Sequence, residues 1–87
     1  MLTKATIVTY EKVPDQYIEE LSIIREDKID ELYELGKTDG TLVRLNEYQI
    51  KRFWVDQQAA EDWKAFMLSA ASQFNINMSF VIEDIPT

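Results

Sequence analysis

Short segments in which apolar and polar side chains alternate, or in which β-branched residues cluster, are separated by two longer segments with helical spacing. The short segments predict four strands, at residues 4–11, 41–45, 48–55 and 76–83. The alternation is clearest in the last, where every even-numbered position from Ile76 to Ile82 is apolar. A turn at Asn46-Glu47 is expected between the second and third strands, but it is a weaker hairpin signal than Asn-Gly, so the register stays open.

The first long segment, residues 15–35, predicts an amphipathic helix that begins after Pro14 and ends before Gly36, a favourable C-cap residue. Its apolar stripe consists of Tyr17, Ile18, Leu21, Ile24, Ile29, Leu32 and Leu35. Arg25 and Lys28 fall on the same stripe. Either their aliphatic stems lie along its edge, or the helix breaks near them.

The second long segment predicts a helix that opens at Asp56, a strong N-cap candidate, and continues through Phe74. Its apolar positions are Ala59, Ala60, Trp63, Phe66, Met67, Ala70, Ala71 and Phe74. Their regular spacing favours a place in the core over a ligand-binding role. The order β-α-β-β-α-β predicts a single α+β domain over residues 1–87. Its arrangement is ferredoxin-like, with two helices on one face of a four-stranded antiparallel sheet.

Side-chain parity assigns the two faces of this sheet. If the apolar positions of residues 76–83 face the helices, the matching residues are Ile7, Val43, Leu45, Phe53 and Val55. The opposite face then carries Thr6, Val8, Tyr10, Leu42, Arg44, Tyr48, Ile50, Arg52, Trp54, Asn77, Ser79, Val81 and Glu83. Such a mixed, partly apolar face predicts an interface between two copies of the chain related by a twofold axis. A ligand pocket and a solvent-facing hairpin are the alternatives, and in the interior of the dimer Arg52 and Glu83 are expected to pair.

The composition limits the chemistry. The chain has 16 acidic and 9 basic residues, a net charge of −7, and neither His nor Cys. These absences exclude disulfides, thiolate nucleophiles, His-based catalytic sets and the usual zinc or haem ligands, so no metal and no cofactor are expected. No signal peptide and no membrane span is recognisable, so a cytoplasmic location is expected.

Negative charge is concentrated on the first helix, where eight acids lie between Asp15 and Glu34 against two basic residues. This charge argues against nucleic-acid partners and anionic membranes. A solvated helix face explains the acids better than a cation site, because one helix rarely supplies enough oxygen ligands. Gly36-Lys37-Thr38 matches the end of a phosphate-binding loop, but it follows a helix and precedes a strand, which is the wrong context.

The stretch RFWVDQQAAEDW, residues 52–63, resembles the strand-to-helix corner of dimeric α/β-barrel proteins, a ferredoxin-like superfamily that includes small monooxygenase-like proteins. In this resemblance an aromatic strand meets the cap Asp56, the pair Ala59-Ala60 and then Trp63. The resemblance extends over residues 41–83. It implies a homodimer and a small hydrophobic or aromatic ligand held between the helices and the sheet. The histidine of the haem-degrading members is missing here, so their activity is not implied.

Two functions are therefore expected. The first is a small, non-enzymatic homodimer that acts as a binding or interaction module. The alternative is a cofactor-independent monooxygenase- or isomerase-like enzyme for a small aromatic or hydrophobic substrate, with Arg52 holding an anionic substrate and Glu83 as the base. The residues expected to line a ligand pocket or dimer face are Tyr10, Arg44, Tyr48, Arg52, Trp54, Asn77, Ser79 and Glu83. A third interpretation makes the acidic helix a docking surface for a basic partner, or a mimic of nucleic acid.

Overall fold

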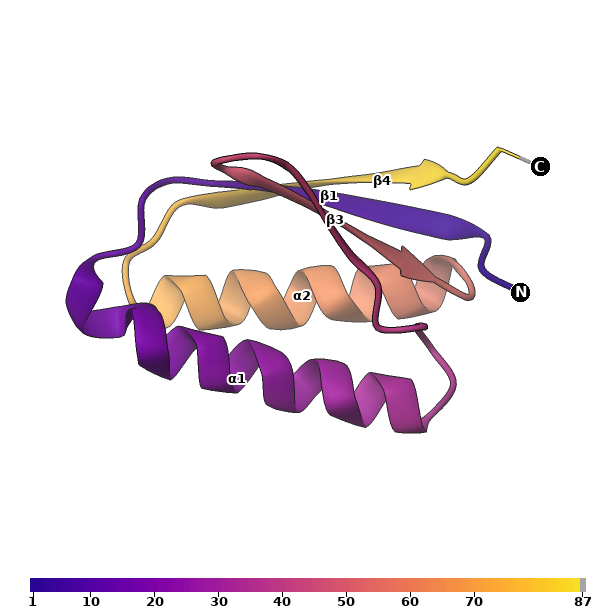
Figure 1. Ribbon diagram of the computed structural model, residues 1–87, viewed down its shortest axis with the longest axis horizontal. Helices are drawn as coiled ribbons and strands as arrows, with labels where there is room; N and C mark the ends of the chain where they lie inside the picture. Colours follow the sequence, from indigo (N-terminus) through magenta and orange to yellow (C-terminus); the bar gives the residue numbers. More distant parts are fainter. Residues whose placement is uncertain (87) are drawn as a thin grey trace.

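The computed structural model describes residues 1–86 and contains every predicted element, with small shifts at the ends. The elements are β1 (Lys4–Tyr10), α1 (Asp15–Glu34), β2 (Leu42–Asn46), β3 (Gln49–Trp54), α2 (Gln57–Gln73) and β4 (Met78–Asp84). All neighbouring strands are antiparallel, and their order is β2-β3-β1-β4. Both helices lie on one side of this sheet (Figure 1), so the ferredoxin-like arrangement is confirmed.

The helix ends follow from the predicted local chemistry. Gly36 adopts a φ of 72°, and the Lys37 N–H donates to the Leu32 carbonyl over 2.9 Å, which closes α1 with a Schellman motif. The Asp56 carboxylate accepts a 2.8 Å hydrogen bond from the Ala59 N–H at the start of α2. Helix α1 is continuous, so the helix break considered near Arg25 is excluded.

The hairpin between β2 and β3 turns at Glu47 and Tyr48, one residue later than predicted. The Asn46 side chain accepts a 2.9 Å hydrogen bond from the Tyr48 N–H and stabilises this turn. The register shifts between Arg44 and Asn46, so one residue of β2 bulges out of the ladder.

The predicted faces of the sheet are right for β4 and wrong for β1, β2 and β3. Thr6 pairs directly with Ile82 on one side and with Arg52 on the other, so all three side chains share a face. That face lies beneath the helices, where Trp54 is fully buried and its ring centroid is 5.4 Å from that of Trp63 on α2. The uncovered face instead carries Ala5, Ile7, Thr9, Val43, Gln49, Lys51, Phe53, Ser79, Val81 and Glu83.

The physical reason for the reversal is that both faces of β1 and β3 carry apolar side chains, so parity alone does not decide between them. Packing decides, because burying the large indole of Trp54 removes more apolar area from water than burying Phe53. The polar residues Thr6 and Arg52 beside Trp54 on the covered face both have favourable contacts there. Thr6 accepts a hydrogen bond from the Trp54 indole, and the Arg52 guanidinium lies over the Trp63 ring at 5.5 Å.

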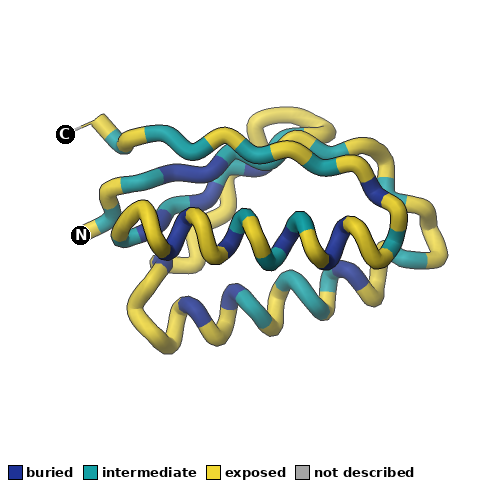
Figure 2. Tube along the Cα trace, turned by 180° about the vertical axis from the view of Figure 1, so that it is seen from behind, coloured by how far each residue is buried: buried dark blue, intermediate teal, exposed yellow. Residues whose placement is uncertain are grey.

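The two helices relate differently to the sheet. Helix α2 runs along β1, β3 and β4, whereas α1 lies beside α2 and approaches no strand backbone among the described residues (Figure 1). The buried residues of both helices face inward (Figure 2). Near its end α1 contributes Ile29 and Leu32 to the core around Trp54 and Trp63, and near its start Leu21 packs on Ala70 and Ala71. No helix of residues 1–86 has the length and apolar character needed to cross a bilayer.

Candidate functional site

A pocket of about 390 Å³ lies between α1, α2 and the covered face of the sheet. Its apolar lining comes from Val8, Val13, Ile18, Leu21, Ile50, Trp63, Met67, Met78 and Phe80. Helix α1 contacts the core through Leu21 and, nearer its end, through Ile29. The pocket lies along the part of α1 before Ile29, where Leu21, Ser22 and Arg25 line it. Ser22 and Arg25 thus place polar groups on the side of α1 that faces the pocket.

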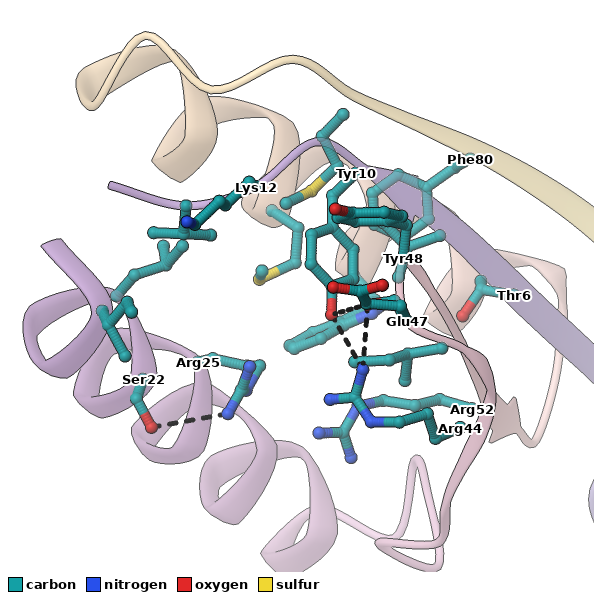
Figure 3. Close-up of a pocket in the computed structure, with 18 residues that line it drawn as sticks. Thr6, Tyr10, Lys12, Ser22, Arg25, Arg44, Glu47, Tyr48, Arg52 and Phe80 are labelled. Carbon is teal, nitrogen blue, oxygen red and sulfur yellow. Dashed lines mark hydrogen bonds between the residues drawn. The ribbon is translucent and has the colours of Figure 1, made fainter. Parts of the chain in front are cut away.

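The three arginines of the chain, Arg25, Arg44 and Arg52, all line this pocket. They come from α1, β2 and β3, and in Figure 3 Arg25 extends from the helix toward the other two. Lys12 is a fourth lining cation, and Glu47 is the lining carboxylate. In a chain with a net charge of −7, this is a strong local concentration of positive charge.

Two of the arginines have hydrogen-bond partners. Arg44 Nη1 donates to the Tyr10 hydroxyl over 3.0 Å and to the Glu47 backbone carbonyl over 3.2 Å. Arg25 Nε donates to the Glu26 carboxylate over 3.2 Å, and its Nη2 to the Ser22 hydroxyl over 3.4 Å. These contacts orient both guanidinium groups at the pocket wall.

Arg52 differs from the other two arginines because its side chain is only 4% exposed. The nearest carboxylate oxygen, Glu26 Oε1, is 4.0 Å from Arg52 Nη2, and within residues 1–86 the guanidinium makes no hydrogen bond. Burial lowers the pKa of Arg52, the Glu26 carboxylate opposes this shift, and the Arg25 cation adds to it. An arginine stays protonated in proteins, so the pocket contains a largely buried cation whose nitrogen atoms are open to the pocket and bond no group of residues 1–86.

The rings of Tyr10 and Tyr48 meet edge to face, with centroids 6.2 Å apart. The Tyr10 hydroxyl donates to the Glu47 carbonyl over 3.3 Å while it accepts from Arg44. Tyr48 is 40% exposed, so this aromatic pair forms a solvent-accessible rim of the pocket. Figure 3 shows both tyrosines above the arginine side chains.

Four of the eight predicted site residues come together in this pocket, namely Tyr10, Arg44, Tyr48 and Arg52. Trp54 does not line it, because Trp54 is sealed in the core beside Trp63.

Ser79 and Glu83 lie on the opposite face of the sheet. Asn77 lies next to β4, where its backbone N–H donates to the Glu11 carboxylate over 3.0 Å. The predicted pair between Arg52 and Glu83 is therefore wrong, since Glu83 pairs with Lys51 at 3.1 Å. Glu83 cannot serve as a base for a ligand in the pocket, because the pocket lies on the other side of the sheet.

Sequence reasoning missed Lys12, Ser22, Arg25 and Glu47 as lining residues, and it assigned Trp63 and Met67 to the core alone. Trp63 and Met67 are buried as predicted and also line the pocket. One signal was available for Arg25, because a charged residue on the apolar stripe of a helix needs either a surface edge or a polar cavity. Lys28, the other cation on that stripe, lies at the surface edge of the helix. Its Nζ is 2.7 Å from the Glu31 carboxylate and 5.1 Å from the centre of the Phe66 ring.

Within residues 1–86 no group of three or more acidic side chains lies close enough together to hold a metal ion. Comparison with protein-family models and with curated proteins finds no match for this chain. The fold is thus assigned on topology, and the resemblance to dimeric α/β-barrel proteins extends only to the ferredoxin-like arrangement.

Proposed function

We propose that this protein is a small-molecule-binding module whose ligand is a compact hydrophobic or aromatic compound held between α1 and the sheet. The observation that carries the proposal is the pocket itself. Its volume of about 390 Å³ falls within the usual range for ligand sites, roughly 300–1,000 Å³. Its composition supports the same function, because a mainly apolar and aromatic lining is combined with a few oriented polar groups.

The position of the pocket explains how a ligand would be stabilised. Trp63 and Phe80 offer ring surfaces from α2 and β4, and Met67 offers a flexible thioether that adapts to ligand shape. A bound aromatic compound would remove these surfaces from water and replace contacts that α1 does not make with the sheet. Binding should therefore also stabilise the folded chain.

The uncharged fluorescent compound N-phenylnaphthylamine tests this proposal. Its fluorescence should rise on addition of the protein and saturate. A Ser22→Phe variant should reduce its affinity at least about tenfold, because the new ring fills the pocket from the α1 side. Ile23→Phe is the matched control, since Ile23 is 55% exposed and does not line the pocket. Absence of saturable binding, or equal binding by all three proteins, contradicts the proposal.

We further propose that two chains pair back to back through the face of the sheet that the helices leave uncovered. Val43 and Val81 on this face are 38% and 59% exposed, and Ile7 and Phe53 beside them are only half-buried. A twofold contact would bury these apolar groups, and it would leave each pocket on the outer side of its own sheet. This geometry is that of a dimeric α/β barrel.

Light scattering at micromolar concentration tests the pairing. The expected mass is twice the chain mass of 10.2 kDa, and Val81→Glu should reduce it to that of a single chain. Ile23→Glu, an equally exposed site on α1, should leave the dimer intact. A wild-type protein of single-chain mass contradicts the pairing and leaves the pocket proposal unaffected.

A further inference from the structure

We infer that the ligand of this pocket carries an oxyanion head group, a carboxylate or a phosphate, which binds to Arg52 with Arg25 beside it. The inference rests on the proposed function, because it requires that the pocket hold a small molecule. It narrows the ligand class from hydrophobic compounds in general to amphipathic organic acids.

Arg52 has hydrogen-bond donors that no group among residues 1–86 accepts. Its side chain is 4% exposed and lines the pocket, and its guanidinium makes no hydrogen bond within residues 1–86. Within residues 1–86 no side-chain nitrogen or oxygen is both sealed from solvent and without a hydrogen-bond partner, so the Arg52 nitrogen atoms are open to the pocket. A planar guanidinium presents paired donors that match a carboxylate or a phosphate. An oxyanion in the pocket would satisfy donors that the chain itself leaves free.

Positive charge exceeds negative charge around the pocket. Glu26 Oε1 is 3.2 Å from Arg25 Nε and 4.0 Å from Arg52 Nη2, so one carboxylate serves two guanidinium groups. In the described part of the chain, Arg44 bonds to uncharged oxygens alone, the Tyr10 hydroxyl and the Glu47 carbonyl. Even with the Glu47 carboxylate on the wall, the lining cations outnumber the acids, and Lys12 adds to the excess. An anionic ligand would relieve the repulsion among these groups.

The lining also favours one orientation of a bound ligand. The Arg52 guanidinium lies 5.5 Å from the centre of the Trp63 ring, so the cation and the aromatic wall are adjacent. A ligand with a flat apolar body could lie along Trp63 and Phe80 while its acidic group reaches Arg52. A neutral compound would use the same wall and leave the guanidinium unsatisfied.

Three compounds that share one ring system separate these possibilities: naphthylacetate, naphthyl phosphate and the uncharged naphthylacetamide. Calorimetric titration of the wild-type protein should give an affinity for at least one of the two anions that is about ten- to a hundredfold above that for the amide. The tighter of the two anions identifies the head group. This comparison needs no variant, so it remains decisive even if a substitution impairs folding.

The variant Arg52→Met should bind all three compounds with affinities within about threefold of one another, close to the wild-type affinity for the amide. Lys51→Met is the matched control, because Lys51 is the adjacent cation on the opposite face of the sheet, and it should keep the full preference. Equal wild-type affinities for anions and amide overturn this inference but not the proposed function. An equal loss of preference in both variants overturns it as well. Failure of all three compounds to bind overturns both proposals.

Discussion

The indole Nε1 of Trp54 donates a 2.9 Å hydrogen bond to the Thr6 hydroxyl in the interior of the domain. The two residues belong to neighbouring strands and are 0% and 1% exposed, so water cannot replace either partner. This bond lets a Trp and a Thr share the face beneath the helices, because the indole N–H is satisfied there. It helps to fix the face that β1 and β3 turn toward the helices, and with it the side on which the pocket forms.

Replacing Thr6 by Val tests this bond. The change keeps the shape of the side chain but leaves a buried indole donor without an acceptor, so the free energy of unfolding should fall by about 1–3 kcal/mol. Urea unfolding followed by tryptophan fluorescence measures the difference. Thr9→Val is the control, since the Thr9 hydroxyl bonds Gln49 in solvent, and its loss should change stability by less than about 0.5 kcal/mol. Equal changes in the free energy of unfolding for the two variants would show that the buried hydrogen bond contributes no more to stability than the exposed one.

Arg52→Met is expected to make the protein more stable while it removes the preference for anions. The guanidinium is buried without a hydrogen-bond partner among residues 1–86, whereas a Met side chain keeps the apolar contact with Trp63 without the cost of burying charge. The free energy of unfolding is expected to rise by about 1–2 kcal/mol, which corresponds to a rise in Tm of roughly 4–16 °C for a domain of this size.

Arg44→Met should instead make the protein less stable, because it removes hydrogen bonds to Tyr10 and Glu47 from an exposed position. A small decrease in Tm is expected there. Thermal unfolding by circular dichroism compares the two variants directly. If Arg52→Met lowers the Tm as Arg44→Met does, Arg52 stabilises the fold and is not a residue that binds a ligand at a cost in stability.

Binding of an organic acid should not depend on pH between about pH 6 and pH 9, because carboxylates titrate near pH 4 and arginine far above this range. Burial lowers the pKa of Arg52 in the folded state, so the cost of its charge is fully present at every pH below that folded pKa. The cost is relieved only as the pH rises through the folded pKa, and arginine remains protonated throughout the range measured. Calorimetric titration of naphthylacetate at several pH values gives the profile. A midpoint inside the range would mean that a group other than Arg52 binds the anion.

Glu83→Gln should leave ligand binding unchanged. The Glu83 carboxylate lies across the sheet from the pocket and pairs with Lys51 at 3.1 Å, where both side chains are partly exposed. Such a surface pair contributes at most about 1 kcal/mol, so only a small loss of stability is expected. Titration of the variant with N-phenylnaphthylamine and with naphthylacetate measures both affinities. A large change in either one would place Glu83 in the site after all.

The sequence was sufficient to predict the order of elements, the capping of α2 by Asp56 and the orientation of β4. These features depend on local signals, namely a cap residue, helical spacing and a clean alternation. The orientation of β3 was predicted wrongly because Ile50, Arg52 and Trp54 combine large apolar groups with a charge, and no local rule decides whether such a face is covered.

The pocket could be predicted only in part, for a related reason. Tyr10, Arg44, Tyr48 and Arg52 were grouped correctly because they share one face of the sheet, although that face was placed on the wrong side. The contribution of Arg25 depends on how far α1 lies from the strands, which is a property of the packed domain. Charge on the apolar stripe of a helix was nevertheless a usable sign of a polar cavity.

The arginine Nε–H groups offer the most direct test of the central claim that Arg52 receives the head group of a small organic acid. The chain has three arginines, and all of them line the pocket, so a proton–nitrogen NMR spectrum of these groups contains few signals, which Arg→Lys variants assign. On titration with naphthylacetate the Arg52 signal should move with a saturable dependence on concentration, and naphthylacetamide should shift it far less. An Arg52 signal that stays in place while naphthylacetate binds, or that moves equally with both compounds, would contradict the account.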